Sequence, residues 1–302
     1  MILNLSEAEI APLLDYGELI PAMETALAEV SSGRAIQPVR NIMTVEEGAR
    51  YLGDMPAITE AGMGAKLVSY YPANAGTEFP THQAMIMLFD PISGAPLACL
   101  DGGLITEMRT AAVSAAATRH LASEKASVLA IIGSGVQARS HLQALRHLYQ
   151  FDEVRVWSRN PEHAAAFAAA HGVRTMALQE AVLGADIVVT ATGSREPLVK
   201  GAWLTEGAHV NAVGAPLPTW RELDDAAMDN TLIVDSRDAV VKESGDVILS
   251  GAPIFAEVGE IFSGDCTPPR SSTTIFKSVG LAVEDIAAAR LVYDKAIAMN
   301  GP

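Results

Sequence analysis

A glycine-rich turn at residues 133–138 stands between five apolar residues, 128–132, and a helical pattern in which leucines recur at 142, 145 and 148. Gly133 permits a tight turn, and Gly135 allows the backbone to approach a pyrophosphate. Ala138 keeps the third position small, where the helix must pack close to the strand. The first N–H groups of the helix, here from Val136 and Gln137, and its positive dipole end attract phosphates. The order strand, turn, helix therefore predicts a dinucleotide site, although such a turn by itself also fits an ordinary loop.

The segment from 128 to about 280 continues as alternating strands and helices. Nearly continuous aliphatic and β-branched runs follow the glycine turn, and an alanine-rich helix begins near Pro161. Such runs are typical of parallel strands that are buried on both faces. The pattern predicts a Rossmann-type doubly wound parallel sheet of α/β class, with further strands at 154–158, 186–192, 209–214 and 232–235.

The chain before this segment has a different character. Two capped helices open it, at Ser6 and Asp15, with Pro21 expected in the first turn of the second helix. Short strand-like runs separated by Gly, Pro and Asn then fill residues 35–105, with a hairpin at 91–94. We expect an α+β substrate and dimerisation domain with a mainly antiparallel sheet, to which the last helix, from Ala282, returns. The expected domains are 1–112 with 281–302, and the dinucleotide-binding domain 113–280.

Composition excludes several classes of protein. The 302 residues are 49% hydrophobic and 19% charged, which is typical of a globular chain. The net charge of −15 argues against a nucleic acid or an anionic membrane as partner. The first residues lack the pattern of a secretion signal, and Cys99 and Cys266 stand in no metal-ligand or redox spacing. We therefore expect a cytoplasmic protein with free thiols, no metal site and no membrane span.

Three cations occupy unusual positions. Arg40 and Lys66 interrupt apolar strand-like runs, where a lysine can equally point into solvent or into a cleft. Arg109 is expected in the first turn of a helix capped by Thr106, where a cation opposes the helix dipole. An anion to bind would explain these positions, and the three residues together would suit a carboxylate.

The end of the second strand of the dinucleotide-binding domain predicts which cofactor binds. An Asp or Glu there would bind the ribose 2′-hydroxyl of NAD and repel a 2′-phosphate. This chain instead has Ser158, Arg159 and Asn160, which are donors suited to a phosphate. The sequence therefore favours NADPH, with NADH possible, unless Arg159 is an ordinary surface arginine.

Several separated blocks, in order, resemble the ornithine cyclodeaminase/mu-crystallin family. They cover nearly the whole chain, and the later ones, including 220–225, look most like the ketimine reductase branch of that family. The blocks are residues 109–114, 133–138, 211–215, 220–225, 242–246 and 276–280.

The resemblance implies a homodimer formed through the N-terminal sheet domain, with the active site in the cleft between the domains. It implies that Arg40, Lys66 and Arg109 hold a substrate carboxylate, with Lys66 and Arg109 as the catalytic residues. Asp238 aligns with an acidic position that contacts substrate in the reductase branch. The implied cofactor-binding residues are Thr81, Arg109, Gly133, Gly135, Val136, Gln137, Ser158, Arg159, Asn160, Thr192, Val213 and Ser278.

One departure from the family pattern affects the expected chemistry. The cyclodeaminases carry an aspartate as general acid and base at the position that Pro216 occupies here. Proline has no titratable group. The family has a second acidic residue some way before the active-site lysine. Residues 51–57, which include Asp54, do not match the family pattern at that position. The resemblance therefore disfavours elimination of ammonia with cyclisation.

A cyclic imine needs less assistance, since its protonated form is already an electrophile. The expected function is NADPH-dependent reduction of a cyclic ketimine carboxylate, Δ1-pyrroline-2-carboxylate or Δ1-piperideine-2-carboxylate, to L-proline or L-pipecolate. Met55 and Met85 are candidates for the wall of an apolar pocket, or are plain core. The alternatives are ornithine cyclodeaminase, an amino-acid dehydrogenase such as alanine dehydrogenase, and a non-catalytic protein that binds NADPH and a small ligand.

Overall fold

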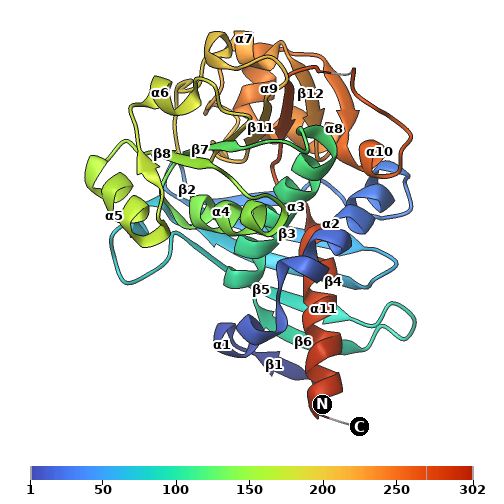
Figure 1. Ribbon diagram of the computed structural model, residues 1–302. Helices are drawn as coiled ribbons and strands as arrows, with labels where there is room; N and C mark the ends of the chain where they lie inside the picture. Colours follow the sequence, from blue (N-terminus) through green and yellow to red (C-terminus); the bar gives the residue numbers. More distant parts are fainter. Residues whose placement is uncertain (1, 270, 301–302) are drawn as a thin grey trace. The chain divides into compact units, whose positions relative to one another are not determined.

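Two compact units make up the computed structural model, which describes residues 2–269 and 271–300. Unit 1 comprises residues 1–110 with 280–302, and unit 2 comprises residues 111–279. Each unit contains one β-sheet, and together they make the α/β fold with one mainly antiparallel and one parallel sheet that the sequence predicts (Figure 1). No helix of the described residues is both long enough and apolar enough to cross a bilayer.

Unit 1 is a six-stranded sheet covered by helices. Its strand order is β1-β6-β5-β4-β3-β2, antiparallel throughout except for the parallel pair of β1 and β6. The strand β1 has only three residues and no sequence pattern of its own. The elements are β1 Leu3–Leu5, α1 Glu7–Ile10, the 3-10 helix η1 Ala11–Leu13, α2 Tyr16–Ser31, β2 Asn41–Glu46, β3 Arg50–Ile58, β4 Met63–Tyr70, the 3-10 helix η2 Pro72–Asn74, β5 His82–Phe89, β6 Pro96–Asp101, the first part of α3 Gly103–Leu121, and α11 Ala282–Asn300.

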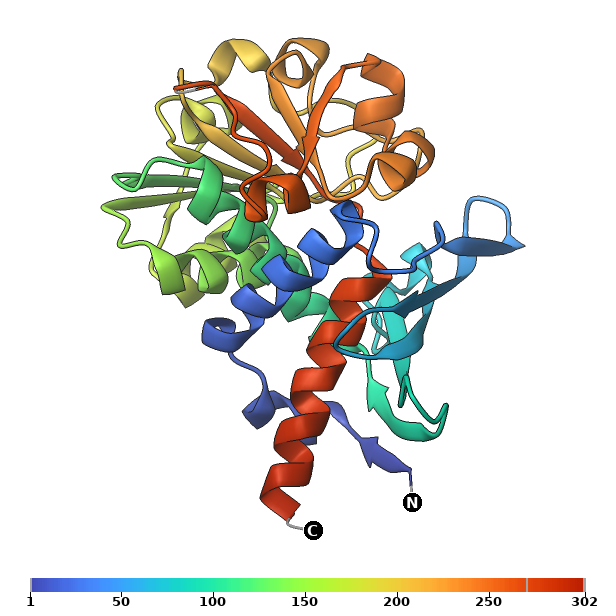
Figure 2. The same ribbon diagram turned by 90° about the vertical axis from the view of Figure 1, so that its right-hand side faces the viewer.

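The last helix, α11, packs on this N-terminal sheet, as the sequence predicts. It lies beside α2 and contacts β3, β4 and β5 (Figure 2). Both expected caps are present, because Ser6 forms a capping box with Glu9 and the Asp15 carboxylate accepts the N–H of Glu18. The position of Pro21 was expected wrongly: α2 begins at Tyr16, so the proline lies inside the helix beyond the first turn.

Unit 2 is an eight-stranded sheet in which every pair of neighbours is parallel. Its order is β13-β12-β14-β11-β10-β7-β8-β9. The elements are β7 Val128–Ile132, α4 Val136–Leu148, β8 Glu153–Trp157, α5 Pro161–His171, β9 Arg174–Thr175, α6 Leu178–Val182, β10 Ile187–Thr190, the 3-10 helix η3 Gly201–Trp203, β11 His209–Ala212, α7 Asp225–Met228, β12 Thr231–Val234, α8 Arg237–Glu243, α9 Gly245–Ser250, β13 Ile254–Glu257, α10 Val258–Phe262 and β14 Thr274–Lys277.

The central strands of this sheet are apolar throughout because both of their faces are covered. Ala130 and Ile132 of β7 belong to a core cluster with residues of α6, α7, α8 and α9. The alternate residues Leu129 and Ile131 are also fully buried. This double coverage explains why the sequence shows unbroken apolar runs rather than alternation. It leaves the ends of the strands as the place where polar groups can gather.

Candidate functional site

The glycine turn after β7 has the geometry that the sequence predicts. Gly133 has φ +129°, and a Cβ there would lie 2.5 Å from the carbonyl oxygen of Ala191, so only glycine fits. Gly135 is the N-cap of α4, and the space where its Cβ would lie is open. Ala138 is fully buried. The turn is therefore tight on the strand side and open on the side from which a ligand would approach.

Five of the predicted cofactor-binding residues follow the ends of five parallel strands. Ser278 follows β14, Val213 follows β11, Thr192 follows β10 by two residues, Gly133 follows β7, and Ser158 follows β8. These strands are consecutive neighbours in the sheet. Because the strands are parallel, the five residues lie along one edge. This carboxyl edge is where doubly wound sheets bind their ligands.

The side chains along this edge have specific partners. The hydroxyl of Ser134 donates to the hydroxyl of Ser158 at 2.9 Å. Among the described residues, Oε1 of Gln137 is buried without a hydrogen-bond partner. A buried acceptor without a donor, beside an open glycine turn, fits a bound group that donates a hydrogen bond. The edge therefore fits a dinucleotide.

The residues expected at the 2′-phosphate are on the surface of unit 2. Arg159 and Asn160 are exposed, and Asn160 caps α5 by accepting the N–H of Glu162. Val136 is exposed in the first turn of α4. Asp238 is exposed in the first turn of α8. Thr81 belongs to unit 1, where its hydroxyl lies 3.2 Å from Nδ1 of His82.

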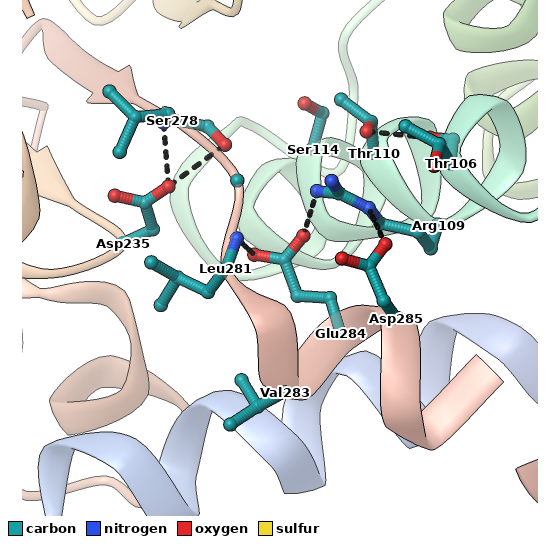
Figure 3. Close-up of polar contacts among 12 residues, drawn as sticks. Thr106, Arg109, Thr110, Ser114, Asp235, Ser278, Leu281, Val283, Glu284 and Asp285 are labelled. Carbon is teal, nitrogen blue, oxygen red and sulfur yellow. Dashed lines mark hydrogen bonds and ion pairs between the residues drawn. The ribbon is translucent and has the colours of Figure 1, made fainter. Parts of the chain in front are cut away.

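The three predicted substrate-binding cations meet inside unit 1. Nζ of Lys66 lies 2.7 Å from Oδ2 of Asp285, and Nε of Arg109 lies 2.9 Å from Oδ1 of the same carboxylate. Arg109 also pairs with Glu284, and Arg40 donates to the carbonyl oxygen of Gly280. Lys66, Arg109, Glu284 and Asp285 are buried, and Figure 3 shows the two carboxylates on α11 facing Arg109. We call the side chains of Arg40, Lys66, Arg109, Glu284 and Asp285 the charge cluster.

Gly280 brings two of the cations close to the start of α11. It has φ +78°, and a Cβ at this position would lie 2.6 Å from Nη1 of Arg109. Its carbonyl oxygen meanwhile accepts from Arg40. A larger residue would displace the Arg109 guanidinium, so this glycine allows the close approach of Arg109.

Three expectations about the local structure around Arg109 and Arg40 were wrong. Helix α3 begins at Gly103, whose N–H is accepted by Asp101, so Arg109 lies in the second turn and does not oppose the dipole. Thr106 is not the cap but lies within the helix, with its hydroxyl 3.4 Å from Nζ of Lys66. Arg40 does not interrupt a strand, since it precedes β2.

The charge cluster changes the proton affinity of Lys66. Burial lowers the pKa of Lys66 to about 8, the charge on Asp285 opposes this shift, and Arg109 and Arg40 add to it. Lys66 is therefore a cation at neutral pH that releases its proton more readily than an ordinary lysine.

The register of unit 1 separates the two candidate methionines. Met55 pairs with Lys66 across β3 and β4, so it shares the face of the sheet on which Lys66 lies, and it is buried. Met85 pairs with Leu67 and lies on the opposite, exposed face. Met85 is thus excluded from the surroundings of Lys66. Asp54 is excluded for the same reason, since it too pairs with Leu67.

Sequence reasoning missed the acidic half of the charge cluster and a second group in unit 2. Glu284 and Asp285 lie in the first turn of α11, where acids are common for the helix dipole alone. Glu222, Asp246 and Lys277 are fully buried in unit 2, where Lys277 pairs with Asp246. Burial raises the pKa of Glu222, Lys277 lowers it and Asp246 raises it further. Glu222, Asp246 and Lys277 lie within the blocks that carry the family resemblance, but no spacing rule indicates their role.

Comparison with known proteins decides the family. The model of the ornithine cyclodeaminase/mu-crystallin family matches residues 1–300. The chain belongs to this family. The resemblance seen in separated sequence blocks is thereby confirmed.

Members of this family with named activities are similar along almost the whole chain. The ketimine reductase mu-crystallin of Mus musculus is 49% identical over 285 residues, 91% of each chain. The structure of Thermococcus litoralis Δ1-pyrroline-2-carboxylate reductase, in complex with NADH and L-proline, has a TM-score of 0.93 at 37% identity and covers 99% of this chain and 98% of that one. An archaeal alanine dehydrogenase dimer with bound NAD also has a TM-score of 0.93, at 31% identity over 99% and 97% of the two chains.

Proposed function

We propose that this protein is an oxidoreductase that reduces cyclic ketimine carboxylates with NAD(P)H, with NADPH preferred. The proposed substrates are Δ1-pyrroline-2-carboxylate and Δ1-piperideine-2-carboxylate, and the products are L-proline and L-pipecolate. The observation that carries the proposal is the charge cluster. It brings together Arg40, Lys66 and Arg109, whose guanidinium and ammonium groups are suited to binding a substrate carboxylate. The named activities of the mouse and Thermococcus relatives support the same reaction class.

The residues of unit 1 bind and orient the substrate in this proposal. Arg40, Lys66 and Arg109 hold the carboxylate, which fixes the direction in which the adjacent imine carbon faces. A bound nicotinamide supplies the hydride that this carbon accepts. Lys66, with a pKa of about 8, donates a proton to the imine nitrogen, so that carbon and nitrogen each gain one hydrogen.

The residues of unit 2 hold the cofactor. The open turn at Gly135 and the first N–H groups of α4 receive the pyrophosphate. Ser158, Arg159 and Asn160 receive the 2′-phosphate, and the exposure of Arg159 leaves its guanidinium accessible. The other proposed cofactor contacts in this unit are Val136, Gln137, Thr192, Val213 and Ser278. Thr81 and Arg109 of unit 1 are also proposed to contact the cofactor, and Asp238 of unit 2 is proposed to contact the substrate.

Cyclodeamination is less well supported. Pro216 offers no acid or base, and Asp54 lies on the face of the sheet opposite Lys66. A cyclodeaminase must move protons on the substrate amine, whereas reduction of an imine requires only one proton and one hydride. The missing aspartate therefore favours the reductase.

We also propose a cytoplasmic homodimer. The face of the unit 1 sheet opposite Lys66 carries four exposed apolar side chains on adjacent strands: Met43, Leu52, Leu67 and Met85. Exposed apolar side chains that adjoin one another are typical of an association surface. A second copy of the chain is the proposed partner, as in the alanine dehydrogenase dimer.

An activity assay tests the proposed reaction directly. Purified protein is mixed with NADPH or NADH and each of the two imines, and the loss of nicotinamide absorbance is followed. We expect turnover of at least one imine, with a larger kcat/KM for NADPH. Ammonia release from ornithine would instead support a cyclodeaminase. Ammonia-dependent reduction of pyruvate would support an amino-acid dehydrogenase, and NADPH binding without any turnover would support a non-catalytic binding protein.

A further inference from the structure

Glu222 is the centre of a buried polar network in unit 2. Its Oε1 accepts the N–H and the hydroxyl of Thr192, each at 2.7 Å. Its Oε2 accepts the hydroxyl of Thr190 at 2.7 Å and the N–H of Gly214 at 2.8 Å. Four donors thus face one carboxyl group, so both of its buried oxygens are satisfied by hydrogen bonds.

The network joins two loops, one after β10 and one after β11. Thr192 belongs to the first loop and Gly214 to the second, and their backbones also meet directly, since Ala215 donates its N–H to the carbonyl oxygen of Thr192 at 2.8 Å. Ala215 has φ +51°, a left-handed conformation that alanine rarely adopts. Strained backbone of this kind persists only where its surroundings hold it. Glu222 is one of the groups that hold it.

Two further charged residues support this arrangement. Nζ of Lys277 donates to the carbonyl oxygen of Gly214 at 2.8 Å and lies 3.0 Å from Oδ2 of Asp246. Oδ1 of Asp246 accepts the backbone N–H groups of Glu222 and Leu223. The backbone of Glu222 is therefore fixed as firmly as its carboxylate, and the position of the two loops depends on the network as a whole.

The strand order indicates which half of a dinucleotide these loops would contact. In the sheet, β8 lies on one side of β7, and β10 and β11 lie on the other. A dinucleotide with its pyrophosphate at the turn after β7 extends one nucleoside toward each side. Ser158 and Arg159 follow β8 and suit an adenosine with a 2′-phosphate. The nicotinamide half then extends over the loops that Glu222 joins.

We propose that Glu222 is a positioning residue that holds the loops after β10 and β11 in the conformation that binds the nicotinamide half of the cofactor. This inference rests on the proposed function, because it requires that unit 2 binds a dinucleotide. It assigns no contact between Glu222 and the cofactor. The carboxylate acts through Thr192, Gly214 and Ala215.

The test compares two ligands on the whole protein. NADPH is titrated by its fluorescence and by calorimetry, and adenosine 2′,5′-bisphosphate, which lacks the nicotinamide half, is titrated by calorimetry alone. In Glu222→Gln an amide NH2 replaces one acceptor and faces donors, so we expect the Kd for NADPH to rise by about tenfold or more. We expect the Kd for adenosine 2′,5′-bisphosphate to stay within about twofold of the wild type.

A second variant and a control complete the design. Thr190→Val removes one donor to Glu222 from a fully buried position and is expected to weaken NADPH binding by a smaller factor, also without effect on the bisphosphate. If Glu222→Gln does not fold, Thr190→Val still tests whether the network affects NADPH binding. Asp186→Asn is the control, because Asp186 accepts backbone N–H groups of Ser127 and Val128 at the opposite edge of the same sheet. This control should leave both Kd values unchanged.

The outcomes separate the two hypotheses. A wild-type protein that binds neither NADPH nor NADH overturns the proposed function, and this inference with it. A wild type that binds NADPH, with variants that bind it equally well or lose both ligands to the same extent, overturns only the role of Glu222.

Discussion

Lys66 and Asp285 form a buried ion pair in which Nζ lies 2.7 Å from Oδ2. The other oxygen of Asp285 accepts from Nε of Arg109 at 2.9 Å. One carboxylate therefore sets the spacing between two cations that we propose to bind the substrate. It also raises the proton affinity of Lys66 against the effect of burial.

Replacing Asp285 by asparagine should change the pH profile of the enzyme. The charge on Asp285 raises the pKa of Lys66, so its loss lowers that pKa below the present value of about 8. Lys66 then loses its proton at a lower pH, and the alkaline decline of kcat/KM moves to lower pH.

The control for this experiment is Asp294→Asn on the same helix, where Asp294 pairs with Arg290 at the surface. Surface pairs of this kind contribute little, so its pH profile should match that of the wild type. An alkaline limb that stays in place in Asp285→Asn would mean that Lys66 does not control it.

Replacing Arg159 by aspartate should shift cofactor preference from NADPH toward NADH. A carboxylate at this position repels a 2′-phosphate and can accept from a 2′-hydroxyl. We expect the ratio of kcat/KM for NADPH to that for NADH to fall at least about tenfold, equivalent to ~1.4 kcal/mol. Arg174→Asp, at another exposed arginine of unit 2, should leave the ratio unchanged. If Arg159→Asp leaves the ratio of kcat/KM for NADPH to that for NADH as unchanged as Arg174→Asp does, the guanidinium of Arg159 does not contact the 2′-phosphate.

Two buried histidines should make the protein sensitive to acid. Burial lowers the pKa of His141 and of His209 from 6.5 to about 4. Between these values the unfolded state binds protons that the folded state does not. The free energy of unfolding should therefore fall as the pH drops from about 6.5 to about 4, by up to ~3 kcal/mol per histidine, and these residues should add no further slope below that range.

Urea denaturation at several pH values measures this slope. His141→Gln can keep the donor to the carbonyl oxygen of Gln137 and the acceptor for Ser114 while removing the titration, so stability should depend less steeply on pH. His163→Gln, at an exposed position, should not change the slope. A slope that is identical in all three proteins would show that His141 titrates normally.

Replacing Leu67 by aspartate should dissociate the proposed dimer. Leu67 is 48% exposed on the face of the unit 1 sheet opposite Lys66, next to Met85. A charge in the centre of an apolar interface must be desolvated, which opposes association. Light scattering after size exclusion should report a dimer for the wild type and a monomer for the variant. Ile92→Asp, at an exposed apolar residue in the turn between β5 and β6, should remain a dimer.

Much of unit 2 could be predicted because its strands are buried on both faces. The strand at 128–132 and the helix from Pro161 were expected at the residues where β7 and α5 lie. The strands β13 and β14 were not predicted as strands, because each apolar run is short and ends at a charged residue, Glu257 or Lys277. Local pattern is informative where an apolar run is continuous and uninformative where a charged residue interrupts it.

The charge cluster could be predicted only in part. Lys66 and Arg109 stand out because cations are unusual among apolar neighbours, but the sequence leaves open whether Lys66 points into solvent. Glu284 and Asp285 lie more than 170 positions from Arg109, and acids at a helix start have a sufficient local explanation. Arg109 was placed in the wrong turn because the Asp101 side chain and the two following glycines, rather than Thr106, set the start of α3.

The chain order of α11 has a consequence for biosynthesis. Polypeptides are made from the amino end, so residues 111–279 leave the ribosome before Glu284 and Asp285. Until then the cations at 66 and 109 lack the carboxylates that neutralise them in the finished fold. The first unit to begin synthesis is therefore the last that can complete its folding, and chains truncated before residue 282 should be targets for cellular quality control.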